Sequence, residues 1–175
     1  MHKVTIRTFM ALKGITPVIF LGLCIKTGSL LISLIVSLFV QPAASRNLYM
    51  GLDLSGLFTF GKMHYMTIAG LMILQTGLKA WMCFDLLRIL SALNLEQPFS
   101  DRVYRLIRNI GRTALVAGIL AVVADKYGGW VMRLGIPLPI EWAAEEILLF
   151  AAILMVIAHV FSRGIELERE QSLTI

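Results

Sequence analysis

Four long apolar stretches divide the chain, and each is long enough to cross a lipid bilayer. They lie at about residues 17–42, 65–90, 107–124 and 142–161. A helix of about 20 mainly apolar residues crosses the hydrocarbon core of a membrane, which is about 30 Å thick. The pattern therefore predicts an all-α fold, an integral membrane bundle of four transmembrane helices in a single domain over residues 1–175.

The start of the first helix has two interpretations because Lys26 interrupts its apolar run. Either Lys26 marks the inner membrane surface and the helix runs on to about Pro42, or the helix starts near Pro17 and holds Lys26 inside the membrane. Both interpretations leave one span in this stretch.

Composition supports membrane insertion. The chain is 58% hydrophobic and 15% charged, with a mean hydropathy of +0.80, whereas soluble domains are about 45–50% apolar and about 25% charged. A soluble domain of this length has too little interior to bury so much apolar surface. The composition thus excludes an ordinary soluble domain and a disordered chain, and it predicts the lipid bilayer as the main partner.

The net charge of +5 is best explained as a topology signal, so we expect no direct contact with nucleic acid. An even number of spans places both termini on one side, and positive residues favour the cytoplasmic side. Ten basic residues lie on the side of the termini: Lys3, Arg7, Lys13, Arg88, Arg102, Arg105, Arg108, Arg112, Arg163 and Arg169. Four lie on the other side: Arg46, Lys62, Lys126 and Arg133. Both termini are therefore predicted to be cytoplasmic.

Small residues recur along one face of each of the last two spans. The residues of the third are Gly111, Ala114, Gly118 and Ala121, and those of the fourth are Ala144, Ala151 and Ala158. Small side chains let helix backbones approach each other in lipid. We expect the third and fourth helices to pack as an antiparallel hairpin, although glycine and alanine are also common in such helices.

The cytoplasmic connector, at about 91–106, continues into an amphipathic helix that Ser100 and Asp101 are suited to begin. Its arginines either anchor the protein to anionic headgroups or form a docking face. The tail, 162–175, is acidic, ends in apolar residues, and extends the fourth helix or pairs with the connector. The candidate partner-binding residues are Arg102, Arg105, Arg108, Glu166, Glu170, Leu173 and Ile175.

Three charged residues lie within spans: Lys26, Lys79 and Asp85. Charge at membrane depth marks a functional candidate, because it costs about 2.5–3.5 kcal/mol even on lenient scales. Asp85 is three residues before Arg88, so the two could pair on one helix face. Lys79 either pairs with Glu145 or Glu146, or snorkels to the surface, or takes part in transport or sensing.

Signatures of catalysis and of cofactor binding are missing from the sequence. Cys24 and Cys83 are isolated, which argues against a disulfide framework, and His64 and His159 lie near opposite membrane faces, which does not suit haem. No phosphate-binding loop, zinc-protease motif or serine-hydrolase motif occurs. We therefore expect no enzyme activity, no cofactor and no metal.

Two segments resemble a known bacterial family. "QPFSDRVYRLIRNIGR" before the third span and "AHVFSRGIELEREQSLTI" after the fourth are similar to the family called domain of unknown function (DUF) 2975. Its members are small four-helix membrane proteins with a Pro-Phe-Ser/Thr step and basic residues in the second connector, a Phe-x-x-Gly segment and a terminal Leu-Thr-Ile/Val. The resemblance covers roughly Leu90 to the C-terminus, and Ser172 stands where the family usually has an acidic residue.

The resemblance implies an integral protein of the bacterial cytoplasmic (inner) membrane, without established activity. Genes of this family often lie beside one for a small helix-turn-helix regulator. We therefore expect a membrane-bound regulatory partner that binds or sequesters such a regulator through the connector and the tail. Two alternatives are a small-solute transporter or channel-like protein acting as a homo-oligomer, and a structural subunit of a membrane complex.

Overall fold

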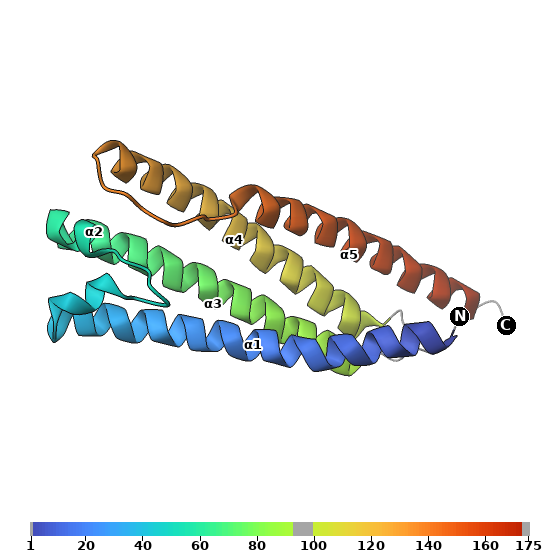
Figure 1. The fold of residues 1–175 in the computed structure, drawn as a ribbon. Coiled ribbons are helices and arrows are strands. Elements are labelled where there is room, and N and C mark those ends of the chain that lie inside the picture. The colour runs from blue at the N-terminus through green and yellow to red at the C-terminus, as the bar shows by residue number, and fades with distance from the viewer. Residues whose placement is uncertain (1, 93–99, 173–175) are drawn as a thin grey trace.

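The computed structural model describes residues 2–92 and 100–172 (Figure 1). This part of the chain contains helices and no strand, which confirms the predicted all-α fold. The elements in chain order are α1 (His2–Phe39), the 3-10 helix η1 (Pro42–Arg46), α2 (Ser55–Phe60), α3 (Lys62–Ala92), α4 (Asp101–Arg133) and α5 (Ala144–Ser172).

Four helices are long and apolar enough to cross a membrane, as predicted. The apolar segments are Phe9–Phe39, Lys62–Ala92, Asp101–Arg133 and Ala144–Leu167. Many of their large apolar side chains point outward, such as Val18 on α1, which is 70% exposed, and Val156 on α5, which is 65% exposed. Outward apolar side chains on both outer helices are what a lipid environment requires, so the protein is a membrane protein.

The long helices pack in the order in which they occur along the chain, α1 against α3, α3 against α4, and α4 against α5. Each runs antiparallel to the one before, so both chain ends lie at the same end of the bundle (Figure 1). We refer to it as the terminal end, and to the opposite end, which carries η1 and α2, as the loop end. Which side of the membrane the terminal end faces stays a prediction.

The first helix begins much earlier than the predicted residue 17. α1 starts at His2 and passes through Pro17 without ending. Pro17 cannot donate to the Lys13 carbonyl, and membrane helices tolerate such an interruption. The adjacent Thr16 hydroxyl donates a hydrogen bond of 2.7 Å to the Leu12 carbonyl. Lys26 therefore lies well inside a continuous helix rather than at its start.

The third helix also differs from its predicted bounds. α4 begins after Ser100, whose hydroxyl accepts a hydrogen bond of 3.3 Å from the Val103 amide, so the amphipathic connector helix and the span form one helix. It does not end at 124 but continues to Arg133. At Gly128 the helix lies beside Trp142 of the connection that follows it, since a Cβ on Gly128 would lie 3.5 Å from Trp142 Nε1, an ordinary contact distance.

The segments that join the helices at the loop end fold back onto the bundle. The connection between η1 and α2 reaches toward the middle of the bundle, and the connection after α4 runs back along it before α5 begins (Figure 1). Leu48, Leu54 and Trp142 from these connections, together with Leu57 of α2, join a buried apolar cluster with residues of α1, α3 and α4. The two returning connections, 47–54 and 134–143, therefore contribute some buried side chains to the interior, while others, such as Met50, stay exposed.

The stripe of small residues on α4 faces α5. A Cβ on Gly111 would lie 3.5 Å from Leu154 Cβ, and one on Gly118 would lie 2.5 Å from Leu148 Cδ2. Ala114, Ala121 and Ala151 are fully buried, Ala158 is 5% exposed, and Ala144 is partly buried. The two helices approach where side chains are smallest, as interfaces in lipid do.

Candidate functional site

A polar cavity of about 220 Å³ lies in the middle of the bundle, between α1, α3 and the two returning connections. It is lined by Lys26, Leu30, Tyr49, Leu52, Met72, Gln75, Thr76, Lys79, Pro139, Ile140, Glu141 and Trp142. We call this the lysine cavity. It joins two lysines that the sequence marked as separate intramembrane candidates.

Both lysines lie far from the ends of their helices. Lys26 is 13 residues before Phe39 and Lys79 is 17 residues after Lys62, or about 20 Å and about 26 Å from the loop end of each helix at 1.5 Å per residue. Lys26 Nζ lies 5.7 Å from the centre of the Tyr49 ring. Among the described residues, neither lysine forms an ion pair.

Gln75 lies one helical turn before Lys79 and lines the same cavity. Its side chain is 4% exposed, yet neither Nε2 nor Oε1 has a hydrogen-bond partner in the described part of the chain. The adjacent Thr76 differs, because its hydroxyl donates to the Met72 carbonyl at 2.9 Å. Buried side-chain amides are nearly always hydrogen-bonded, so Gln75 brings unused donor and acceptor capacity to the cavity.

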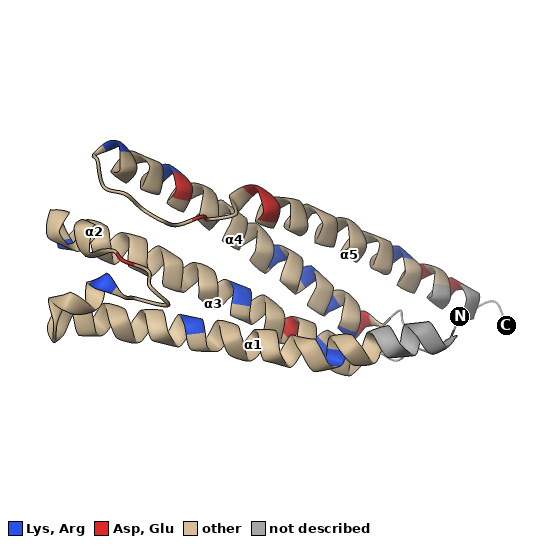
Figure 2. Cartoon of the chain, viewed as in Figure 1, with Lys and Arg blue, Asp and Glu red and all other residues tan. Residues whose placement is uncertain are grey.

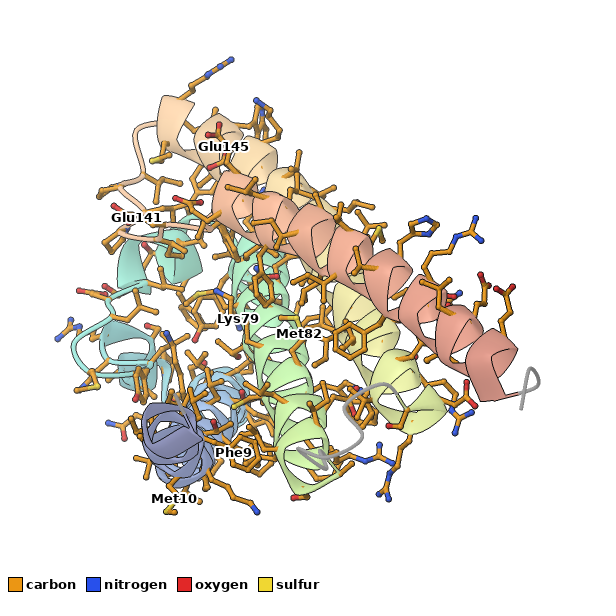
Figure 3. All side chains as sticks on the ribbon, turned by 90° about the vertical axis from the view of Figure 1, so that its right-hand side faces the viewer. Phe9, Met10, Lys79, Met82, Glu141 and Glu145 are labelled. Carbon is orange, nitrogen blue, oxygen red and sulfur yellow. The ribbon has the colours of Figure 1, made fainter. Side chains whose placement is uncertain are left out.

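The acidic residue at the cavity is Glu141, not Glu145 or Glu146. Glu141 belongs to the returning connection after α4, and its side chain is exposed. Figure 3 shows Lys79 extending from α3 toward the side on which Glu141 lies, whereas Glu145 lies at the start of α5. Neither Glu145 nor Glu146 pairs with Lys79, because α5 starts beyond the connection that closes the cavity.

This arrangement suits the binding of an anion. The cavity holds two ammonium groups and one unpartnered amide, which together offer several hydrogen-bond donors. Small-molecule sites combine apolar walls with placed polar groups, and this cavity has both. The described residues contain no group of three or more histidine, cysteine, aspartate or glutamate side chains placed to hold a metal ion.

A second feature lies at the terminal end, where arginines from two helices surround a hollow of about 290 Å³. We call it the arginine hollow, and it is lined by Arg88, Arg102, Arg105, Leu106 and Asn109. Figure 2 shows that basic residues follow the part of α4 nearest to the chain ends. The hollow brings two of the predicted partner-binding arginines together with Arg88 of α3.

Asp85 holds Arg88 in place at the hollow. Asp85 is 1% exposed, and Arg88 Nη1 donates a hydrogen bond of 3.3 Å to its carboxylate. The Arg88 guanidinium also lies 5.7 Å from the centre of the Phe84 ring. The local pairing expected for Asp85 and Arg88 is therefore formed, which makes Asp85 a positioning group rather than part of the lysine cavity.

The other predicted partner-binding residues lie apart from the hollow. Arg108 stacks over Tyr104, with 5.1 Å between guanidinium and ring centre, and lies outside the hollow lining. On α5, Arg163 pairs with Glu166 at 2.9 Å, so this pairing is within the tail, and Glu170 is exposed. Leu173 and Ile175 lie outside the described residues.

At the loop end, Asp53 lines a third hollow of about 470 Å³, between α2 and the connection after α4. The side chain and the backbone N–H of Ser55 both hydrogen-bond the carboxylate, the latter at 2.8 Å, and they hold the pKa of Asp53 below its ordinary value. Asp53 thus carries a stable negative charge at the start of α2, where the helix dipole favours it.

His64, which the sequence places near one membrane face, has a side-chain partner at the loop end. Its Nδ1 lies 2.6 Å from the Tyr127 hydroxyl, and its ring lies 5.6 Å from that of Trp130. These contacts tie the start of α3 to the last turns of α4. His64 therefore has a structural role, while His159 is exposed on α5.

Sequence reasoning missed the residues that complete the two sites, Gln75, Tyr49 and Glu141 at the cavity and Arg88 at the hollow. One signal was available for Gln75, because its spacing of four residues from Lys79 places both on one face of a helix. Tyr49 and Glu141 carry no such signal, since they reach the cavity only through the folding of the connections.

Comparison with known proteins gives one family and no individual relative. The sequence model described as "Protein of unknown function (DUF2975)" matches residues 62–175, which adds the second span to the region where the resemblance was expected. No curated protein and no solved structure matches the chain.

Proposed function

Since the chain belongs to the DUF2975 family, a family of unknown function, we propose that it is a non-enzymatic regulatory protein of the bacterial cytoplasmic membrane. Its partner is a small helix-turn-helix transcriptional regulator in the cytoplasm. The regulator binds at the terminal end, through the arginine hollow and the adjacent tail.

The observation that carries this proposal is the arginine hollow. Arg88, Arg102 and Arg105 converge from two helices on one concave surface, and none of the described residues that line it is a carboxylate. Guanidinium groups bind carboxylates through paired, charge-assisted hydrogen bonds. A partner with an acidic side chain or an acidic helix end on its surface would therefore fit this hollow.

Anchoring to lipid headgroups accounts for the hollow less well. Arginines that only fix topology need to reach the headgroups, and they need no partner that orients them. Arg88, by contrast, is held by a buried carboxylate at 3.3 Å and faces the hollow from a different helix than Arg102 and Arg105. An oriented, concave set of guanidinium groups is typical of specific recognition.

The tail supports the same location. Ala158 and Phe161 of α5 pack with Val103, Leu106 and Ile107 of α4 in one apolar cluster. The exposed residues that follow on α5, including Glu166 and Glu170, are thereby held near the start of α4. A partner at the hollow would have basic residues of α4 and acidic residues of α5 within its reach.

The test measures binding of the full-length protein in lipid nanodiscs to the purified helix-turn-helix regulator encoded nearest to its gene. We expect saturable binding that weakens as salt rises, and a loss of at least tenfold in affinity in an Arg102→Ala/Arg105→Ala variant. Tenfold corresponds to about 1.4 kcal/mol. Thermal unfolding of both proteins would verify that the variant is folded.

The matched control is Arg46→Ala/Arg133→Ala, which removes two exposed arginines at the loop end. We expect this variant to bind as the wild type does. An equal loss of affinity in both double variants would mean that net charge alone accounts for the interaction, which would contradict a specific site at the hollow. Absence of binding by the wild type would also contradict the proposal.

One observation favours a second function, small-solute transport by an oligomer. Lys26 and Lys79 share the lysine cavity at mid-height in the bundle, where a permeating anion would need favourable groups. In proteoliposomes without any regulator, anion flux that is lost in Lys79→Met would support transport. Flux equal to that of empty liposomes would leave the regulatory function as the better explanation.

A further inference from the structure

We propose that the lysine cavity is a binding site for a small organic anion that carries a carboxylate on a compact apolar body. This goes beyond the proposed regulatory function, because the site lies away from the arginine hollow, and it names the ligand class of the cavity without requiring transport. Lys79 precedes Arg88 by nine residues on α3, which corresponds to about 14 Å along the helix.

The charge balance of the cavity is the first argument. Two lysines line one cavity at mid-height in a membrane bundle, and no ion pair in the described part of the chain neutralises either of them. Like charges in a medium of low dielectric constant repel each other strongly. Glu141, which lines the cavity, is exposed and pairs with neither lysine. A bound carboxylate would offset both the repulsion and the loss of solvent.

The second argument is independent of charge and comes from Gln75. Its amide is 4% exposed, and both of its polar atoms lack partners within the described residues. A ligand oxygen could accept a hydrogen bond from Nε2, which would satisfy a buried donor that no described residue satisfies. A buried amide without hydrogen-bond partners is unfavourable. A ligand that supplies those partners would explain why a glutamine occupies this position.

The walls and the volume define the rest of the ligand. Leu30, Met72, Ile140 and Trp142 provide apolar and aromatic surface around the polar groups. The volume of about 220 Å³ exceeds that of an engineered cavity of about 150 Å³ that binds benzene. A ring or a short branched chain with one carboxylate therefore fits, and benzoate is a suitable probe.

The depth of the site favours a small molecule over a lipid headgroup. Lys79 lies about 26 Å from one end of α3 and about 20 Å from the other. Phosphate groups of bilayer lipids lie outside a hydrocarbon core of about 30 Å, so they are farther from the centre of the helix than Lys79 is. A lipid headgroup and a small carboxylate both present an anionic oxygen, and the experiment below distinguishes the two ligands.

The experiment uses the full-length protein in nanodiscs and follows thermal unfolding with benzoate, with benzamide as its neutral counterpart, and with inorganic phosphate. We expect benzoate to raise the unfolding midpoint saturably, and benzamide and phosphate to leave it unchanged. In Lys79→Met the dissociation constant for benzoate should rise at least tenfold. Lys126→Met, which removes an exposed lysine outside the cavity, should bind as the wild type does.

Two further measurements keep the result decisive. Gln75→Leu keeps both lysines, and we expect it to weaken benzoate binding at least threefold even if Lys79→Met fails to fold. In a variant that keeps Trp142 alone (Trp81→Phe/Trp130→Phe), benzoate should shift the tryptophan emission, because Trp142 lines the cavity. Replacing phosphatidylglycerol by phosphatidylcholine in the nanodisc should not alter benzoate binding.

Several outcomes would overturn the proposal. These are an equal response to benzamide, unchanged benzoate affinity in both Lys79→Met and Gln75→Leu, or no saturable binding of benzoate. Stabilisation by phosphatidylglycerol that depends on Lys79 and is not displaced by benzoate would assign the site to a lipid. None of these outcomes bears on regulator binding at the arginine hollow, which is measured without benzoate.

Discussion

Ser37 on α1 and Tyr65 on α3 share a hydrogen bond of 2.7 Å between their hydroxyl oxygens, and both side chains are fully buried. The Ser37 hydroxyl also lies 2.8 Å from the Leu34 carbonyl, to which it donates. Because serine has one hydroxyl proton, and Ser37 uses it on the Leu34 carbonyl, the arrangement assigns Tyr65 as the donor to Ser37. Tyr65 is therefore the donor of this bond and Ser37 its acceptor, so the two residues are not equivalent.

Removing either partner of this bond should destabilise the protein by different amounts. In Tyr65→Phe, Ser37 keeps its bond to Leu34, so we expect a loss of about 0.6 kcal/mol in the free energy of unfolding, the average for such bonds between membrane helices. In Ser37→Ala, the buried Tyr65 hydroxyl loses its acceptor, which costs about 1–3 kcal/mol. Equilibrium unfolding in mixed detergent would measure both.

The double variant Ser37→Ala/Tyr65→Phe serves as the control for this comparison. It should be more stable than Ser37→Ala alone, because no hydroxyl is left without a partner. If Tyr65→Phe were the more damaging single change, the assigned direction of the bond would be incorrect.

A side chain at Gly118 should weaken the contact between α4 and α5. A Cβ there would lie 2.5 Å from Leu148 Cδ2 and 3.4 Å from the Leu148 amide nitrogen. Overpacking of this kind costs about 1–3 kcal/mol, which outweighs the gain of about 1 kcal/mol that alanine brings to a helix. We expect Gly118→Ala to lower the thermal unfolding midpoint and Gly118→Leu to prevent folding.

Two variants test the cause of that loss. Gly70→Ala on α3 is the matched control, because no described atom would lie within 4 Å of its Cβ, and it should be neutral or stabilising. Adding Leu148→Ala to Gly118→Ala should restore part of the stability. Without such rescue, the close approach at Leu148 would not be the explanation.

The long helices of this fold were predictable from the sequence. The contacts that the two returning connections make with the helices were not. The four apolar helices, the Ser100 cap and the pairing of Asp85 with Arg88 depend on residues near each other in sequence. The predicted end of the third span, at residue 124, was wrong because the segment from Asp125 to Gly129 has the composition of a turn. In the helix that the structure shows there, Tyr127 bonds to His64 and Gly128 lies beside Trp142, and local composition contains neither of these relationships.

The same division applies to the sites. Lys26, Lys79, Arg102 and Arg105 were identified from the sequence because charge in or beside an apolar run is conspicuous. Their grouping could not be derived, since it depends on which helix faces pack together and on two connections that fold inward. A glutamine such as Gln75 becomes informative only when its burial is known.

Loss of Arg88 should destabilise the terminal end because it leaves the Asp85 carboxylate buried without its partner. Asp85 is 1% exposed and accepts a hydrogen bond from Arg88, and such bonds to charged groups contribute about 1.5–3 kcal/mol. We expect Arg88→Met to lower the free energy of unfolding by about 2 kcal/mol and Asp85→Asn/Arg88→Met to recover much of this loss.

The matched control is Arg163→Met, since Arg163 and Glu166 have the same spacing of three residues but are 70% and 55% exposed. Exposed pairs contribute about 0–1 kcal/mol, so this variant should remain close to the wild type. Equal effects at the two pairs would show that burial of Asp85 has no energetic consequence.

Replacing Gln75 by leucine should stabilise the ligand-free protein. A buried amide without partners costs about 1–3 kcal/mol, and leucine has a similar size and no polar atoms. We expect Gln75→Leu to raise the unfolding midpoint without ligand, and Gln75→Asn, which keeps an amide, to give no such gain. A lower midpoint in Gln75→Leu would indicate that the amide has a partner in the native protein.

The direction of insertion decides whether the arginine hollow can meet a cytoplasmic partner. In a Cys24→Ser/Cys83→Ser background, Leu134→Cys places a thiol at an exposed position just after α4, at the loop end, and Ser91→Cys places one at the terminal end of α3. The excess of basic residues at the terminal end predicts that this end is cytoplasmic. A membrane-impermeant maleimide should therefore label Leu134→Cys in intact spheroplasts, and Ser91→Cys only after lysis. The reverse pattern would place the hollow outside the cell, which would contradict the proposed function but leave the lysine cavity as a possible ligand site.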